Sequence, residues 1–142
     1  ELLRKVANAI TFAHVENVIH RDLKPANILL DQEGEPHVSD FVLAKHTAKS
    51  EDAADPSLTV TGQVLGTPSY MPPEQAAGKS AEIGPHSDVY SLGATLFELI
   101  AGRPPHMGPT LIATLASAAA IQAKFRSRIH WAVVSRSFTS VI

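Results

Sequence analysis

Residues 20–27 carry the sequence His20-Arg21-Asp22-Leu23-Lys24-Pro25-Ala26-Asn27. This segment places a carboxylate, an ammonium group and a side-chain amide close together, and its proline disfavours a regular helix. We therefore expect a loop that presents polar side chains. An acid and an asparagine at this spacing are, by themselves, more typical of an ordinary turn. Their interpretation depends on the sequence around them.

Two further blocks follow this loop along the chain. They are Asp40-Phe41-Val42 and Gly66-Thr67-Pro68-Ser69-Tyr70-Met71-Pro72-Pro73-Glu74. Residues 20–27 match the protein-kinase catalytic-loop pattern H-R-D-L-x-x-x-N at every specified position. The second block matches D-F-G at its first two positions, and the third resembles the kinase segment that ends in A-P-E. One such block would be weak, but three in this order are specific.

The chain therefore resembles a eukaryotic-like (Hanks-type) bacterial serine/threonine protein kinase over about residues 1–106. The resemblance implies a mainly α (α+β) fold, that of a kinase C-terminal lobe with a small β-hairpin and without its N-terminal lobe. It also implies transfer of the ATP γ-phosphate to a serine or threonine of a protein substrate, with Mg²⁺.

The apolar pattern predicts elements that fit this fold. A three-and-four spacing predicts a helix over residues 1–15 with one buried stripe. The members of the stripe are Leu3, Val6, Ile10 and Ala13. Residues 28–30 and 36–38 flank Asp31-Gln32-Glu33-Gly34, which predicts a hairpin with a short turn. Residues 45–66 have no apolar period, which indicates an irregular loop.

A second helix is predicted over residues 87–101. Ser87 is a suitable N-cap, and Gly102 suits the position that follows a helix. We expect one buried apolar face, formed by Val89, Leu92, Leu96 and Ile100. Residues 110–125 have a helix-forming composition with weak periodicity.

The resemblance assigns roles to five residues. Asp22 matches the base that accepts the substrate hydroxyl proton, and Lys24 matches the cation that approaches the transferred phosphate of ATP. Asn27 and Asp40 match the metal-binding positions, and Mg²⁺ prefers such oxygen ligands. Thr67 matches the hydroxyl that ties the substrate-facing loop to Asp22 and Lys24. Lysine at position 24 also favours serine/threonine over tyrosine specificity.

Regulation by phosphorylation is implied by Arg21. In kinases with this arginine, its side chain pairs with a phosphate on the activation loop. That loop would run from Asp40 to Glu74, and Thr59 and Thr61 are the candidate phosphorylation sites from their position before Gly66.

Four residues receive structural roles. We interpret His20 as a packing residue rather than a base, and Phe41 as part of the core. The resemblance implies that Asp88 is buried and bonded to the catalytic-loop backbone. Glu74 normally pairs with an arginine late in the lobe, but no matching arginine is evident here.

The sequence also departs from the family. No Gly-rich loop, V-A-I-K-type lysine or partner glutamate precedes the first helix, so the residues that cover ATP are missing. Val42 replaces a glycine, and a β-branched residue there is expected to bias Asp40 away from metal geometry. Pro72 replaces an alanine and should be tolerated.

Composition limits the remaining classes. A net charge of −2 argues against nucleic-acid binding over the whole surface, and the absence of cysteine excludes disulfides and thiolate sites. The histidines lack metal-ligand spacing, and no apolar run approaches the ~20 residues of a membrane span. A cytoplasmic location is expected. Acidic residues end at Glu98, so we assign residues 1–106 to a partial kinase domain and residues 107–142 to a divergent basic tail.

Two alternatives to an active kinase stay open. One is a catalytically inactive, pseudokinase-like interaction module, which Val42 and the missing N-terminal lobe favour. The other is a non-functional truncated product without a stable fold. A binding module should unfold cooperatively, whereas a chain without a fold should not.

Overall fold

The computed structural model describes residues 1–41 and 66–126, the last five of these by their backbone alone. Val42, Thr59, Thr61, most of the segment predicted to be irregular and residues 127–142 lie outside this description. In the described part, helices predominate and the sheet is a single two-stranded antiparallel ribbon. The mainly α (α+β) prediction is confirmed.

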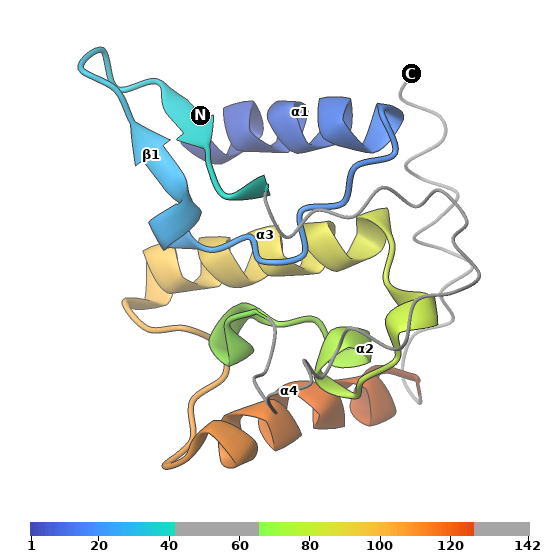
Figure 1. Cartoon of the computed structure of the whole chain (residues 1–142). Coiled ribbons are helices and arrows are strands. Elements are labelled where there is room, and N and C mark those ends of the chain that lie inside the picture. Colours follow the sequence, from blue (N-terminus) through green and yellow to red (C-terminus); the bar gives the residue numbers. More distant parts are fainter. Residues whose placement is uncertain (42–65, 127–142) are drawn as a thin grey trace.

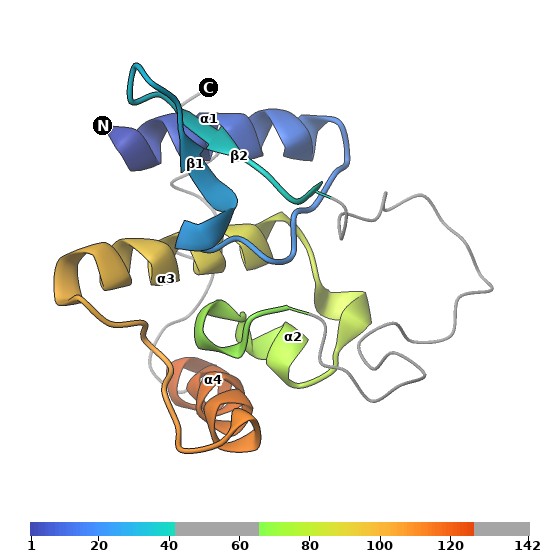
Figure 2. The same ribbon diagram turned by 60° about the vertical axis from the view of Figure 1, so that its left-hand side comes forward.

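The elements lie in layers around one long helix, α3 (Pro85–Ala101). Helix α1 (Leu2–Val15) and the hairpin lie on one side of α3, and α2 (Pro73–Ala76) and α4 (Leu111–Arg126) lie on the other (Figures 1 and 2). Helices α1 and α3 run in opposite directions. No helix in residues 1–41 or 66–126 is long and apolar enough to cross a membrane.

Helix α1 forms as its apolar spacing predicts. Val6 and Ile10 are buried and form the core cluster together with Leu23 from the loop that follows. Ile28 and Val38 of the hairpin pack against this cluster. The predicted helix is confirmed, but of its stripe only Val6 and Ile10 are buried, and Leu3 and Ala13 are partly exposed. The burial of Val6 and Ile10 fixes the loop at residues 20–27 against α1.

The hairpin is also confirmed. Strand β1 (Ile28–Leu30) pairs with β2 (Pro36–Val38), and Ile28 lies opposite Val38. In the turn, Asp31 Oδ1 accepts hydrogen bonds from the backbone N–H groups of Glu33 and Glu35 at 3.0 and 2.8 Å. The turn therefore holds the second strand in register, and β2 leads directly into Asp40.

Helix α3 differs from the prediction at its start. Its N-cap is Gly84 rather than Ser87, because Pro85 suits the first helical position, where no backbone donor is needed. Ser87 instead lies one turn into the helix, where its hydroxyl accepts from the Gly84 N–H at 3.2 Å. At the other end Gly102 has a φ of 68° and its N–H donates to Glu98 O, as expected of a terminating glycine.

The predicted buried face of α3 is wrong. Val89, Leu96 and Ile100 are 59, 45 and 79% exposed, and only Leu92 of the four packs against the core cluster. The buried residues are small or polar: Ser87, Asp88, Ser91, Ala94 and Thr95. The helix lies between two segments of irregular backbone, so the residues that it buries are those that can bond to backbone or pack closely.

Helix α4 confirms the helix-forming composition of residues 110–125. It packs against α2 and the short turn Pro68–Tyr70, and Thr114 and Ala118 are buried there. A polar chain joins it to α3: Tyr90 bonds to His106 Nε2 at 2.6 Å, and His106 Nδ1 lies 3.3 Å from Ser117 Oγ. Burial and the charge of Glu74 raise the pKa of Tyr90 to about 12, so its hydroxyl is protonated and can donate to His106, while burial lowers the pKa of His106 and favours its neutral form.

We expect this chain to make stability depend on pH. Burial lowers the pKa of His106 below its ordinary value of 6.5. As pH falls through the pKa of an unfolded histidine, about 6.5, the unfolded chain takes up a proton that the folded chain does not. The free energy of unfolding should therefore fall as pH falls from about 6.5 towards the lower folded pKa, and His106 should contribute no slope above this range.

The measurement is urea unfolding at a series of pH values for the parent and His106→Phe. The variant should be less stable at neutral pH, where Tyr90 loses its acceptor, but its stability should fall less steeply on acidification. Parallel curves for the two proteins would show that His106 does not titrate in this way.

Candidate active site

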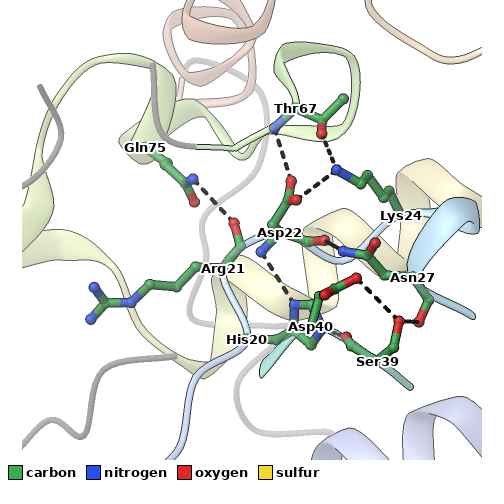
Figure 3. Close-up of polar contacts among 9 residues, drawn as sticks. All are labelled: His20, Arg21, Asp22, Lys24, Asn27, Ser39, Asp40, Thr67 and Gln75. Atoms are coloured by element: carbon green, nitrogen blue, oxygen red, sulfur yellow. Dashed lines mark hydrogen bonds and ion pairs between the residues drawn. The ribbon is translucent and has the colours of Figure 1, made fainter. Parts of the chain in front are cut away.

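The three sequence blocks meet at Asp22. Figure 3 shows Asp22 at the centre of a set of polar side chains, with Lys24 and Asn27 beside it on the same loop and Thr67 facing it from the segment before Pro68–Tyr70. Asp40 approaches from the end of β2. The structure thus brings together five residues that the sequence spreads over positions 22–67.

Both carboxylate oxygens of Asp22 are held. Oδ1 accepts from the Thr67 N–H at 2.9 Å, and Oδ2 accepts from Lys24 Nζ at 2.7 Å. The Asp22 side chain is 11% exposed and that of Lys24 is 23% exposed. This ion pair is therefore partly removed from water, and the carboxylate cannot rotate without losing two bonds.

Lys24 also donates to the Thr67 hydroxyl at 2.6 Å. The predicted tie from Thr67 therefore has two parts: the hydroxyl bonds to Lys24, whereas the backbone N–H bonds to Asp22. Three residues from two distant segments form a closed set of contacts. This arrangement can present a carboxylate and a cation to the same reacting group.

Asn27 is buried, and its side-chain Nδ2 donates to the Asp22 carbonyl at 2.8 Å. This bond identifies the other end of the amide as the oxygen. The backbone carbonyl of Asn27 accepts from the Ser39 N–H at 2.9 Å, and this bond joins the loop to the residue before Asp40. The side-chain amide is thus oriented by its bond to Asp22, whereas the backbone of Asn27 is held by Ser39.

Asp40 is exposed and has a φ of 61°. Aspartate tolerates this left-handed region better than most residues. Ser39 Oγ lies 3.3 Å from Asp40 Oδ2, and Figure 3 shows the Asp40 carboxylate turned towards Ser39. Mg²⁺ is typically held by one or two protein oxygens together with phosphate oxygens and water, so an amide oxygen and a carboxylate suit it. Within residues 1–41 and 66–126 no cluster of three or more His, Asp or Glu forms a further metal site.

Helix α3 holds the loop at residues 20–27 through one carboxylate. Asp88, which is 1% exposed, accepts from the His20 N–H and the Arg21 N–H, both at 2.9 Å. His14 of α1 lies 2.8 Å from the same carboxylate. A carboxylate placed at the centre of the fold therefore fixes the backbone immediately before Asp22.

Of the other three structural candidates, His20 and Glu74 are buried, and Phe41 is partly buried against the core cluster. His20 is fully buried, and its Nε2 lies 2.8 Å from Ser39 O while its ring contacts Phe41 edge-on. Glu74 is buried and accepts from Ser87 Oγ at 2.6 Å. Hydrogen bonds and packing thus explain why His20 and Glu74 are buried.

Comparison with known proteins decides the family. A model described as "Protein kinase domain" matches residues 1–142. The chain belongs to the protein kinase domain family.

Among relatives of this kinase chain, serine/threonine-protein kinase PknB of Mycolicibacterium smegmatis is 39% identical over 113 residues, which cover 80% of the chain and 17% of the relative. PknB of Mycobacterium leprae is 42% identical over 108 residues, covering 76% of the chain and 16% of the relative. A probable PknB of Bifidobacterium longum is 38% identical over 113 residues, covering 80% and 16%. The predicted likeness to bacterial serine/threonine kinases is confirmed, and the chain spans less than a fifth of these relatives.

The family model continues to residue 142, and α4 lies after residue 106. The division into a domain ending at 106 and a tail from 107 stays a prediction.

Arg21 is turned away from Asp22 (Figure 3). Its Nε is buried without a hydrogen-bond partner among the described residues. Burial lowers the pKa of Arg21, and the nearby Asp88 carboxylate opposes that shift. The predicted phosphate partners, Thr59 and Thr61, lie outside the described residues.

Three contributors to this candidate site were not predicted: His14, Ser87 as the partner of Glu74, and Gln75. Gln75 Nε2 donates to the Arg21 carbonyl at 3.1 Å. Glu74 also has His86 Nε2 3.5 Å away, so a serine and a histidine contact the carboxylate that normally pairs with an arginine in the family. No spacing rule relates these pairs, because they lie far apart in sequence and only the fold brings them together.

Proposed function

We propose that this chain forms the catalytic-loop part of a serine/threonine protein kinase that transfers the γ-phosphate of ATP to a protein hydroxyl. The observation that carries the proposal is the Asp22 carboxylate held between the Thr67 N–H and Lys24 Nζ. Phosphoryl transfer depends mainly on positioning and charge stabilisation, and this arrangement supplies both. The names of the relatives support protein serine/threonine specificity.

Within this proposal, Asp22 accepts the proton of the substrate hydroxyl. Lys24 lies within hydrogen-bonding distance of Asp22 and Thr67, so its ammonium group can offset negative charge on the phosphate that reacts beside Asp22. Thr67 keeps the substrate-facing segment against both groups. Because ATP is the phosphate donor, we place the reaction in the cytoplasm, where ATP is available.

Asn27 and Asp40 would hold Mg²⁺, which neutralises phosphate charge when bound. The Asn27 amide is oriented by its bond to Asp22 O, whereas Asp40 is exposed and its Oδ2 lies 3.3 Å from Ser39 Oγ. We further propose that phosphate on the activation loop binds at Arg21, whose buried Nε supports such a partner.

The test is Mg²⁺-dependent ATP binding measured by calorimetry. Asp40→Ala should weaken binding in Mg²⁺ by at least about tenfold, since one of two protein ligands is lost. The matched control is Asp31→Ala, which removes an exposed carboxylate in the hairpin turn and should bind like the parent. If Asp40→Ala binds as well as Asp31→Ala, Asp40 is not a metal ligand.

A further inference from the structure

The backbone of Arg21 is held in an uncommon conformation. Its φ is 70°, a left-handed value that residues with a Cβ adopt only where surrounding contacts maintain it. On one side of the residue, its N–H donates to Asp88 Oδ1 at 2.9 Å. On the other, its carbonyl accepts from Gln75 Nε2 at 3.1 Å. Two elements, α3 and α2, therefore hold the backbone N–H and carbonyl of the residue that precedes Asp22.

Gln75 also lies against the second segment that holds Asp22. A Cβ atom built on Gly66 would lie 2.8 Å from Gln75 Nε2 and 3.7 Å from Asp22 Oδ1. Gly66 has a φ of 109° and is followed directly by Thr67, whose N–H bonds to that same carboxylate oxygen. The Gln75 amide thus lies between the catalytic loop and the returning activation segment (Figure 3).

We propose that Gln75 is a positioning residue: its side-chain amide holds the Arg21 carbonyl and thereby sets the direction of the Asp22 carboxylate. This inference rests on the proposed role of Asp22 as the base. It requires a side chain with the reach of glutamine and an N–H donor. Methionine has similar length without a donor, and an ionised glutamate can only accept, so it would face the Arg21 carbonyl unfavourably.

The alternative is that Gln75 only fills space beside Gly66. Gln75→Met separates the two roles, because it keeps the length and removes the donor. Gln75→Glu is a second variant with nearly the same shape. A space-filling role predicts that both behave like the parent, whereas a positioning role predicts that both are impaired and that Glu is impaired more.

The first readout is amide hydrogen exchange by NMR in the chain itself. In Gln75→Met, exchange at Arg21 and Thr67 should rise about tenfold, the effect of losing one hydrogen bond. Exchange at Ile10, in the core of α1, should stay unchanged. Gln32→Met, the same substitution at an exposed turn residue, is the matched control. Unchanged exchange at Arg21 and Thr67, or an equal rise at Ile10, would overturn the inference.

The second readout is phosphoryl transfer in a chimaera in which the chain replaces the matching segment of Mycolicibacterium smegmatis PknB. Gln75→Met should lower kcat about tenfold with KM for ATP unchanged, because a displaced base affects the transition state and not nucleotide binding. A rise in KM with kcat unchanged would count against positioning. If the parent chimaera transfers no phosphate, the proposed function fails, while the exchange measurement still decides whether Gln75 holds the loop.

Discussion

Replacing Asp22 with asparagine is expected to lower kcat for phosphoryl transfer by about 10²–10⁴-fold, the usual contribution of a positioned base. The substitution is nearly isosteric, so the Thr67 N–H keeps an oxygen acceptor on residue 22. The charge that attracts Lys24 Nζ at 2.7 Å is lost, as is the group that takes the substrate proton. Lys24 keeps its 2.6 Å bond to the Thr67 hydroxyl, so KM for ATP should change little.

This is measured in the PknB chimaera with a serine-containing protein substrate. Asp31→Asn is the matched control, since Asp31 is an exposed carboxylate that caps the hairpin turn. The control should keep full activity. An Asp22→Asn chimaera with more than about a tenth of parental kcat would be inconsistent with a general base, whose removal costs at least about a hundredfold.

Asp88→Ala is expected to lower the free energy of unfolding by about 2–6 kcal/mol, because each of two buried backbone donors left without an acceptor costs about 1–3 kcal/mol. Asp88 is 1% exposed and has three donors around it: the His20 N–H, the Arg21 N–H and His14 Nε2. Alanine would leave two buried backbone donors without an acceptor. The left-handed backbone of Arg21 would also lose one of its restraints.

The measurement is chemical denaturation at neutral pH, monitored by circular dichroism. Asp31→Ala again serves as the control, because it also removes a carboxylate that accepts two backbone donors, but at an exposed turn. The control should change stability by less than about 1 kcal/mol, since water can replace the lost acceptor. A similar loss of unfolding free energy in Asp88→Ala and Asp31→Ala would show that the burial of Asp88 adds nothing to stability.

The local sequence pattern was sufficient to predict the elements that bury apolar side chains. The stripe through Val6 and Ile10 gave α1, and the short apolar runs on either side of Asp31 gave the hairpin. The same logic was wrong for α3, because it assumes that a helix buries its aliphatic side. In α3 the buried side carries Asp88 and Ser91, which bond to other segments, and Thr95, whose hydroxyl donates to Ser91 O within the helix.

For the site, linear motifs predicted which residues come together but not how they are held. Asp22, Lys24 and Asn27 lie in one loop, so their proximity follows from sequence. The bond from Thr67 to Asp22 joins residues 45 positions apart, and that from Gln75 to Arg21 joins residues 54 apart. Such pairs depend on how α2 and α3 are placed, and no local pattern contains that information.

The contacts of Thr67 with Asp22 and Lys24 also bear on the order in which the protein folds. Closing a loop of this length costs about 3 kcal/mol in chain entropy, which local helix and hairpin contacts do not require. The site should therefore assemble after α1, the hairpin and α3 have formed as local elements, and it should come apart before they do on heating. Loss of phosphoryl transfer would then precede loss of helical signal in a temperature ramp. The inactivation temperature would report on the contact between Thr67 and Asp22 and not on the stability of the whole chain.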